Sequence, residues 1–503
     1  MRIKIEPCKL KGTVTAPPSK SYAHRMLIGA ALACLGGGSE GAVCSDLITE
    51  TCRVTGISES EDMLATIDCL KALGLEVQKE DCCVSIFKTN ESKGRKKSVG
   101  SAGVDSKDSS FDSESENCGG LDCNSPCKNL KEQLPVFSCR ESGSTLRFMI
   151  PIALSACCGG VFRGTPRLIE RGIGVYEEMF EKLGIYVEKT KDSITVLGSL
   201  PAGDYQIRGD VSSQFITGML FALSMKQDDS RIEVLPPVES RSYIDITLDV
   251  LKQFGISVRE EAENVFLIPG GQKFKKGEYQ VEGDWSNAAF LFALQILGNN
   301  LEIQGVNPDS IQGDRACVRF LKQLKSGVTE STLTHLKQSP DSELDVSGPD
   351  EIEGNSDILT IDRSNVFSVV QTTNETIDLS DTPDLGPVLF AAAAALRGGH
   401  FTGTKRLRIK ESDRAQAMAE ELAKFGIPVL VGENDVIVLH SPLRKPAAPL
   451  NGHNDHRIVM ALSVLASLMG AEIEDAQAVA KSWPGFFETL EEAGLKWFVL
   501  RKP

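Results

Sequence analysis

The chain has 503 residues, of which 41% are hydrophobic and 24% charged, so we expect about two to four globular domains. Its formal net charge of −15 excludes the broad basic surface that non-specific nucleic-acid binding needs. The longest apolar run, residues 148–162, is broken by Pro151 and two glycines and is too short to cross a bilayer. The start of the chain lacks the apolar core of a signal peptide. We therefore expect a cytoplasmic protein that binds neither nucleic acid nor membrane.

The 14 cysteines are scattered through apolar and loop stretches, which indicates reduced thiols rather than a disulfide framework. Cys118, Cys123 and Cys127 are close enough in sequence to hold a metal, but their spacing is not that of a usual zinc site. A solvated loop is the preferred interpretation, and no metal is expected. P-loop, dinucleotide-binding, zinc-helix and nucleophile-elbow motifs are all missing from the sequence, so no cofactor is expected either.

Along the chain, six short polar stretches each open a predicted helix rich in alanine, leucine and glycine. They are "SKSYAHRMLIGAAL", "SGSTLRFMIPIAL", "SSQFITGMLFAL", "SNAAFLFAL", "PDLGPVLFAAAA" and "NDHRIVMALSVLA". The leading serine or aspartate of each is a predicted helix N-cap: Ser19, Ser142, Ser212, Ser286, Asp384 and Asp455. These helices are apolar on every side, which predicts burial.

A second phrase follows each opener and predicts the last turn of a helix, a glycine, and an alternating strand. Its five good copies are "LKALGLEV", "FEKLGIYV", "LKQFGISV", "LAKFGIPV" and "LEEAGLKW". A sixth, degenerate copy is "FLKQLKSGV". Two low-complexity insertions, residues 89–133 and 326–358, lengthen two of the intervals between openers. Without them the chain is six α/β units of about 70 residues each, which predicts two lobes of three units.

Lysines and arginines gather at the helix openers, as at Lys20, Arg25, Arg147 and Arg457. Helix N-termini offer free N–H groups and the positive end of the helix dipole, which suits phosphate and carboxylate groups. Basic residues taken singly more often cap helices or lie on the surface, but their recurrence across the repeats favours a site for two small polyanions. Further cationic stretches are "RGTPRLIER", "ESRSYID", "TKRLRIKESDR" and "KSWPGF".

Two acids stand among these cations, Asp384 and Glu411, and they are candidates for a general base and a general acid. His456 is either a proton shuttle or a neutral hydrogen-bonding histidine.

Ten motifs in order, from about residue 10 to 490, resemble the signatures of the 5-enolpyruvylshikimate-3-phosphate (EPSP) synthase family. They are "PPSKSYAHR", "SGSTLRF", "TPRLIERGI", "GDVSSQF", "SRSYIDITL", "VEGDWSNAAF", "DTPDLGP", "LRIKESDR", "NDHRIVMA" and "KSWPGFF". The resemblance implies a two-lobed inside-out α/β barrel of six βαβαββ repeats, three per lobe, with chain crossings near Ser19 and Gly283. The lobes would comprise residues 20–283, and residues 1–19 with 284–503.

The resemblance also implies the reaction: transfer of the enolpyruvyl group of phosphoenolpyruvate to shikimate 3-phosphate with release of phosphate, without a metal or organic cofactor. By similarity, Asp384 would take the proton of the 5-hydroxyl group, and Glu411 with Lys20 would protonate the methylene carbon. Shikimate 3-phosphate would be held by Lys20, Ser21, Arg25, Ser212, Ser213, Gln214, Ser240, Tyr243, Asp384, Arg406 and Lys410. Phosphoenolpyruvate would be held by Lys20, Gly143, Arg171, Gln214, Arg414, Arg457 and Lys481. The expected partners are these two small molecules, and a monomer is expected.

The sequence departs from the family pattern at two positions near the expected site. Glu141 and Arg406 both stand where many members carry asparagine; Arg406 either contacts the substrate phosphate or pairs with Glu411.

Two alternatives stay open at this point. UDP-N-acetylglucosamine carboxyvinyltransferase shares the fold, but that enzyme carries a cysteine in the loop corresponding to residues 163–174, where this chain has none. A non-catalytic anion-binding protein is the second alternative.

Overall fold

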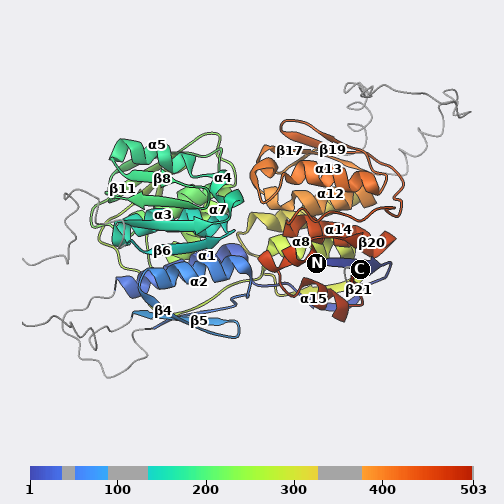
Figure 1. The fold of residues 1–503 in the computed structure, drawn as a ribbon, viewed down its shortest axis with the longest axis horizontal. Coiled ribbons are helices and arrows are strands. Elements are labelled where there is room, and N and C mark those ends of the chain that lie inside the picture. Colours follow the sequence, from blue (N-terminus) through green and yellow to red (C-terminus); the bar gives the residue numbers. More distant parts are fainter. Residues whose placement is uncertain (37–50, 89–133, 327–375, 501–503) are drawn as a thin grey trace, which may run out of the picture.

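The computed structural model describes residues 1–36, 51–88, 134–326 and 376–500. They form two lobes side by side, and both ends of the chain lie in the same lobe (Figure 1). The segments 89–133 and 327–375 lie outside the described residues. They contain both predicted insertions, except for Ser326, and also Cys118, Cys123 and Cys127.

Four sheets of four strands share one topology, in which a parallel pair is extended by two antiparallel strands. Two consecutive units show it completely. The first consists of β6 (Val136–Arg140), α3 (Gly143–Cys157), β7 (Gly159–Gly164), α4 (Pro166–Arg171), α5 (Gly174–Leu183), β8 (Tyr186–Lys189) and β9 (Ser193–Leu197). The second consists of β10 (Asp204–Arg208), α6 (Ser213–Leu223), β11 (Ser230–Leu235), α7 (Arg241–Gln253), β12 (Arg259–Ala262) and β13 (Val265–Ile268).

The other two four-stranded sheets vary this plan slightly. In the N-terminal unit, α1 (Lys20–Leu35), β3 (Cys52–Thr55), α2 (Glu61–Ala72), β4 (Leu75–Glu80) and β5 (Cys83–Lys88) are completed by β14 (Glu278–Gln280), which returns to pair with β3. In the other lobe the unit comprises β16 (Ile377–Asp378), η4 (Pro383–Leu385), α12 (Gly386–Ala395), β17 (Gly399–Thr402), η5 (Lys405–Ile409), α13 (Arg414–Lys424), β18 (Val429–Val431) and β19 (Asp435–Val438).

The two remaining units have smaller sheets within the described part of the chain. One unit has β2 (Lys11–Thr15) paired with β15 (Asn300–Gln304), together with α8 (Trp285–Ile296), η3 (Gly313–Ala316) and α9 (Cys317–Ser326). The other has β1 (Arg2–Glu6) between β20 (Ala471–Ile473) and β21 (Lys496–Leu500), with α14 (His456–Met469), η6 (Ala476–Lys481) and α15 (Phe486–Glu492). The two-lobed α/β fold expected from the repeats is confirmed.

The six helices that follow the polar openers, α1, α3, α6, α8, α12 and α14, are buried along most of their length, as expected. Ser19, Ser142, Ser212 and Asp455 are their N-caps, each accepting a hydrogen bond from a backbone N–H group. Two N-cap predictions were wrong. Asp284, not Ser286, caps α8, and Asp384 lies in the 3-10 turn η4, which leaves its carboxylate free of a capping role.

The glycine of each good copy of the second phrase follows a helix end with a positive φ angle, from +66° at Gly184 to +105° at Gly494. A strand follows each of them, as the phrase predicts.

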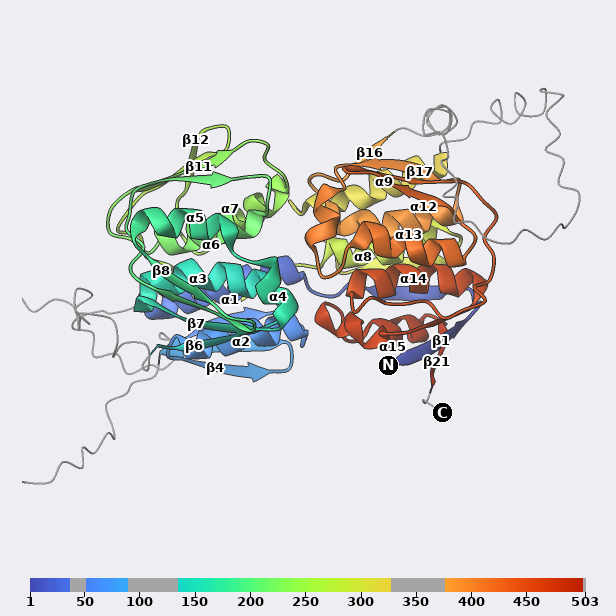
Figure 2. The same ribbon diagram turned by 45° about the horizontal axis from the view of Figure 1, so that its top comes forward.

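Two hydrophobic cores lie in the two lobes. One is built from side chains between Tyr22 and Val281, and the other from side chains between Ile3 and Val14 and between Trp285 and Leu495. The chain passes between the lobes at two adjacent points, where Pro18 and Gly283 form a bridge and the Ser19 N–H donates to the Glu282 carbonyl oxygen at 2.7 Å. Figure 2 shows these connections at the junction of the lobes.

Candidate active site

A polar cavity lies where the helix openers of both lobes converge. Among the residues named from the sequence it is lined by Lys20, Ser21, Arg25, Gly143, Arg171, Ser212, Ser213, Gln214, Ser240, Tyr243, Asp384, Arg406, Lys410, Glu411, Arg414 and His456. Most first-lobe residues come from the N-terminal ends of α1, α3, α6 and α7, and Arg171 is the last residue of α4. The second-lobe residues come from η4, η5, the turn between η5 and α13, and the starts of α13 and α14. Helix N-termini that point into one cavity add their dipoles to the charge of its lysines and arginines, which favours bound anions.

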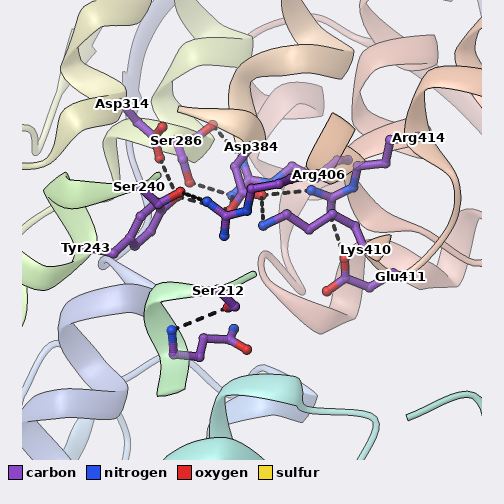
Figure 3. A network of polar contacts seen from close by, with 12 residues as sticks. Ser212, Ser240, Tyr243, Ser286, Asp314, Asp384, Arg406, Lys410, Glu411 and Arg414 are labelled. Atoms are coloured by element: carbon purple, nitrogen blue, oxygen red, sulfur yellow. Dashed lines mark hydrogen bonds and ion pairs between the residues drawn. The ribbon is translucent and has the colours of Figure 1, made fainter. Parts of the chain in front are cut away.

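Asp384 is the most heavily paired carboxylate of the cavity (Figure 3). Its Oδ1 accepts from Arg414 Nη1 at 2.8 Å and lies 3.2 Å from Lys410 Nζ, and its Oδ2 accepts from the Tyr243 hydroxyl at 3.2 Å. Burial by itself raises the pKa of Asp384, but Lys410, Arg457, Arg414 and Lys20 outweigh it and hold the pKa well below its usual range. Asp384 is therefore ionised, as a general base has to be.

Arg414 organises the carboxylates of the second lobe. Only 1% of its side chain is exposed, and it donates to Asp384, to Glu411 Oε2 at 2.8 Å and to Asp455 Oδ2 at 2.8 Å. Burial raises the pKa of Glu411, whereas Arg414, Arg171 and Lys20 lower it, and the net result is a pKa well below the usual value. Glu411 is thus also ionised among these cations.

The two lysines that line the cavity differ in the direction in which their pKa values are shifted. Lys20 Nζ lies 3.0 Å from Asp62; burial lowers the pKa of Lys20, but Asp62 and Glu411 more than compensate and raise it. Burial lowers the pKa of Lys410 to about 8, although Asp384 opposes the shift. Lys410 is therefore the lysine of the cavity closest to losing its charge near neutral pH.

Serine and glycine residues shape the first-lobe wall. Ser240 has a left-handed φ of 58° and makes no capping bond to α7, so its hydroxyl is free to accept from the Arg406 guanidinium across the lobes. Gln214 is clamped between Arg147 Nη1, at 2.6 Å, and Ser144 Oγ, at 2.9 Å. A Cβ atom on Gly143 would stand 3.2 Å from Arg171 Nη2, so only glycine leaves this guanidinium undisturbed.

Two of the residues expected to bind a substrate, Arg457 and Lys481, do not line the cavity. Arg457 lies behind Asp384, where its Nη2 is 3.6 Å from Asp384 Oδ2 and its Nη1 donates to the Ser286 carbonyl oxygen at 2.8 Å. Lys481 Nζ forms an ion pair with Glu141 Oε2 at 2.5 Å and donates to the Asn454 carbonyl oxygen at 2.7 Å. Arg406 does not pair with Glu411; its ion-pair partner is Glu239, at 3.5 Å.

Sequence reasoning missed several residues of the site. Asp62, Ser144 and Phe148 also line the cavity, and Asp314 and Asp455 lie directly behind it. Asp455 was named only as an N-cap, and nothing in the spacing of Asp62 or Asp314 set them apart from surface acids.

His456, which lines the cavity, has a pKa lowered well below its usual value by burial and by Lys20 and Arg457, so it is neutral.

The described residues contain no group of three or more histidine, cysteine, aspartate or glutamate side chains placed to hold a metal ion. Within the same residues, no helix combines the length and the apolar character needed to cross a membrane.

The fold and the cavity are those of a two-lobed α/β protein whose cationic cavity, lined from both lobes, suits small anions. The EPSP synthase (3-phosphoshikimate 1-carboxyvinyltransferase) family model matches residues 5–105 and 120–490, and the chain belongs to this family.

Relatives named 3-phosphoshikimate 1-carboxyvinyltransferase include that of Clostridium kluyveri, 35% identical over 497 residues, and that of Clostridium novyi, 32% identical over 498 residues. Each alignment covers 98% of this chain and 97% of the relative. A solved structure of EPSP synthase from Acinetobacter baumannii matches with a TM-score of 0.63 and 21% identity, covering 99% of this chain and 100% of the other, and it supports the fold.

Proposed function

We propose that the chain transfers the enolpyruvyl group of phosphoenolpyruvate to the 5-hydroxyl group of shikimate 3-phosphate and releases phosphate, a step of chorismate and aromatic amino-acid biosynthesis. The observation that carries the proposal is the ionised Asp384 among Lys410, Arg414 and Tyr243 in a cavity lined from both lobes. The cysteine-free loop around α4 disfavours UDP-N-acetylglucosamine as acceptor.

The substrate roles follow the two sides of the cavity. We assign shikimate 3-phosphate to Lys20, Ser21, Arg25, Ser212, Ser213, Gln214, Ser240, Tyr243, Asp384, Arg406 and Lys410, and phosphoenolpyruvate to Lys20, Gly143, Arg171, Gln214 and Arg414. Arg457 and Lys481, which lie outside the cavity lining, complete the phosphoenolpyruvate set if a small rearrangement brings them to the ligand.

In the proposed reaction Asp384 removes the proton of the 5-hydroxyl, and that oxygen bonds to C2 of phosphoenolpyruvate. The electron pair of the C2–C3 double bond takes a proton from Glu411, assisted by Lys20, and a tetrahedral ketal phosphate forms. C3 then returns a proton to Glu411 and the enol ether is restored as the C2–O bond to phosphate breaks. The electron pair of that bond leaves with the phosphate oxygen, which takes up a proton from water. Positioned cations hold together two anions that otherwise repel, which is the main source of rate available to such a site.

Glu411 has to be protonated before it can give a proton to the methylene carbon, yet the cations around it hold its pKa well below the usual value. Two bound anionic substrates neutralise Arg414, Arg171 and Lys20 electrostatically, so they raise the pKa of Glu411 toward the range in which a carboxylic acid donates a proton.

Phosphate release is the direct test. With both substrates present we expect continuous release, and with either substrate alone none. Equal release without shikimate 3-phosphate, or no release with both, would contradict the proposal. Asp384→Ala is expected to bind shikimate 3-phosphate by calorimetry but to turn over about 10²–10⁴-fold more slowly.

We also propose that the enzyme acts as a monomer in the cytoplasm, with lobes of residues 20–283 and of residues 1–19 with 284–503. The lobe bounds are supported by the two separate cores. Light scattering of the purified protein tests the monomer.

A further inference from the structure

Asp314 lies at the back of the cavity, on η3, and has no role in the proposed reaction so far. Only 6% of the residue is exposed. Its Oδ2 accepts a hydrogen bond from the Tyr243 hydroxyl at 3.1 Å, and the same hydroxyl lies 3.2 Å from Asp384 Oδ2. One phenol therefore bridges the buried carboxylate of Asp314 and the partly exposed carboxylate of Asp384, as Figure 3 shows.

The second carboxylate oxygen of Asp314, Oδ1, is buried and has no hydrogen-bond partner among the described residues. The titratable groups that face Asp314 are Tyr243 of α7, Asp384 of η4, Arg457 of α14, Asp284 before α8 and Cys317 of α9. Arg457 is the only cation in this set, and its guanidinium is committed to Ser286 and Asp384. Asp314 thus lacks the lysine and arginine partners that surround Asp384.

We propose that Asp314 is the final proton acceptor of a proton relay. In this relay the proton that Asp384 takes from the substrate passes through the Tyr243 hydroxyl to Asp314. The proposal rests on the proposed role of Asp384 as base. In the relay, Asp384 Oδ2 gives its proton to Tyr243 Oη while Tyr243 gives its own proton to Asp314 Oδ2. The phenol ends neutral, Asp384 is again a carboxylate, and Asp314 is a carboxylic acid that returns its proton to solvent after product release.

The environments of the two carboxylates make this direction favourable. Asp384 is a weak base, because its cations hold its pKa well below the usual range. Burial, and then the charge of Asp384, raise the pKa of Asp314 to about 7, so a proton on Asp384 moves downhill to Asp314. Burial also raises the pKa of Tyr243 well above its usual value, so the bridging phenol keeps a proton to pass on.

The test is the pH dependence of turnover in Asp314→Asn. In the unaltered enzyme kcat should rise as pH increases through the pKa of Asp314, which burial and the charge of Asp384 hold above that of an ordinary carboxyl group, because only ionised Asp314 accepts the proton. Asp314→Asn should lower kcat by about 10-fold to 100-fold and change the KM for shikimate 3-phosphate by no more than about threefold. In this variant kcat should no longer show the rise with pH that the ionisation of Asp314 causes. The substrates' phosphate groups titrate near pH 6 in both proteins, so only the difference between the two profiles reports on Asp314.

Tyr243→Phe interrupts the same relay without altering Asp314. The double variant is expected to lose no more in kcat than the more impaired single variant, because both changes break one pathway. Glu421→Gln is the matched control: Glu421 is 2% exposed but pairs with Lys424 and the Asn451 N–H away from the cavity, so its pH profile should match that of the unaltered enzyme.

A lower kcat in Asp314→Asn with an unchanged pH profile would show a structural role and overturn the relay, as would additive losses in the double variant. An inactive Asp384→Asn beside an Asp314→Asn of normal rate and profile would also overturn the relay, but would leave the proposed function standing. Full turnover by Asp384→Asn would instead refute the base and the relay together.

Discussion

Glu141 holds the ammonium group of Lys481 across the two lobes, with 40% of the Glu141 side chain and 14% of the Lys481 side chain exposed. If Lys481 is to bind phosphoenolpyruvate, the substrate has to compete with this carboxylate. Ion pairs of this exposure contribute about 0.2–1 kcal/mol. We therefore predict that Glu141→Gln lowers the KM for phosphoenolpyruvate by about twofold to fivefold, with kcat unchanged, in steady-state assays.

The control for Glu141→Gln is Glu59→Gln, which removes an exposed partner of Lys79 outside the cavity and should change neither constant. An unchanged KM in Glu141→Gln would mean that Lys481 does not meet phosphoenolpyruvate.

Lys410 makes substrate affinity depend on pH. Burial lowers its pKa to about 8, so its charge is present below pH 8 and is lost as the pH rises through that value. A dianionic phosphate binds the charged form better, and we predict that calorimetric affinity for shikimate 3-phosphate falls by up to about tenfold per pH unit above pH 8. Lys410→Arg should flatten this dependence, since arginine stays charged. If the affinity of Lys410→Arg still fell with pH above pH 8, the titrating group would be a residue other than Lys410.

At the scale of elements, the close approach of α3 and α6 depends on Gly218. A Cβ atom there would stand 2.5 Å from both the Arg147 carbonyl oxygen and the Tyr176 hydroxyl, which are themselves hydrogen-bonded at 2.8 Å. Over-packing costs about 1–3 kcal/mol, whereas alanine gains about 1 kcal/mol of helix propensity. We predict that Gly218→Ala lowers the free energy of unfolding by up to about 2 kcal/mol in denaturant titration.

Gly174→Ala is the matched control on α5, because the nearest atom to the new Cβ would be 3.9 Å away. It should be neutral or slightly stabilising. If the two variants had equal free energies of unfolding, α3 and α6 could move apart without any loss of stability.

The elements were predictable because each repeat carries its own local signals. Glycines such as Gly184 mark helix ends through their left-handed φ angles, and buried helices such as α6 are apolar on every side. The N-caps of α8 and α12 were mispredicted because the aligned polar residue does not keep one position in every repeat: Asp284 caps α8, and the extra turn η4 frees Asp384.

The site was less predictable than the elements. Charged residues at helix openers, such as Lys20 and Arg25, are visible in the sequence, but a pairing such as Glu141 with Lys481 joins residues 340 positions apart on opposite lobes. Asp314 looks like an ordinary polar residue of a loop, and only the packing of α7 against η3 and η4 places it beside Tyr243 and Asp384.

At the scale of the whole molecule, an acidic chain of net charge −15 surrounds a cationic entrance to the cavity. A groove that adjoins the cavity is lined by Arg147, Arg167, Glu170, Arg171, Val211, Ser212, Gln214, Arg406, Arg408, Ile409 and Lys410. Six of these side chains are cationic and one is acidic, so the groove concentrates anions at the mouth of the site.

Arg167 and Arg408 lie in this groove without lining the inner cavity, and we predict that they act on substrate capture. The double variant Arg167→Gln/Arg408→Gln should lower kcat/KM for both substrates by about threefold to tenfold and leave kcat unchanged, because the lost charge steers encounter rather than chemistry. Raising salt from about 0.05 M to 0.5 M should lower kcat/KM in the unaltered enzyme and less so in the variant, since the screening length shrinks to a few ångströms. Arg231→Gln, which removes an exposed arginine paired with Glu233 and Glu261, should keep the full salt dependence. A double variant with the salt dependence of the unaltered enzyme would show that the inner cations alone attract the substrates.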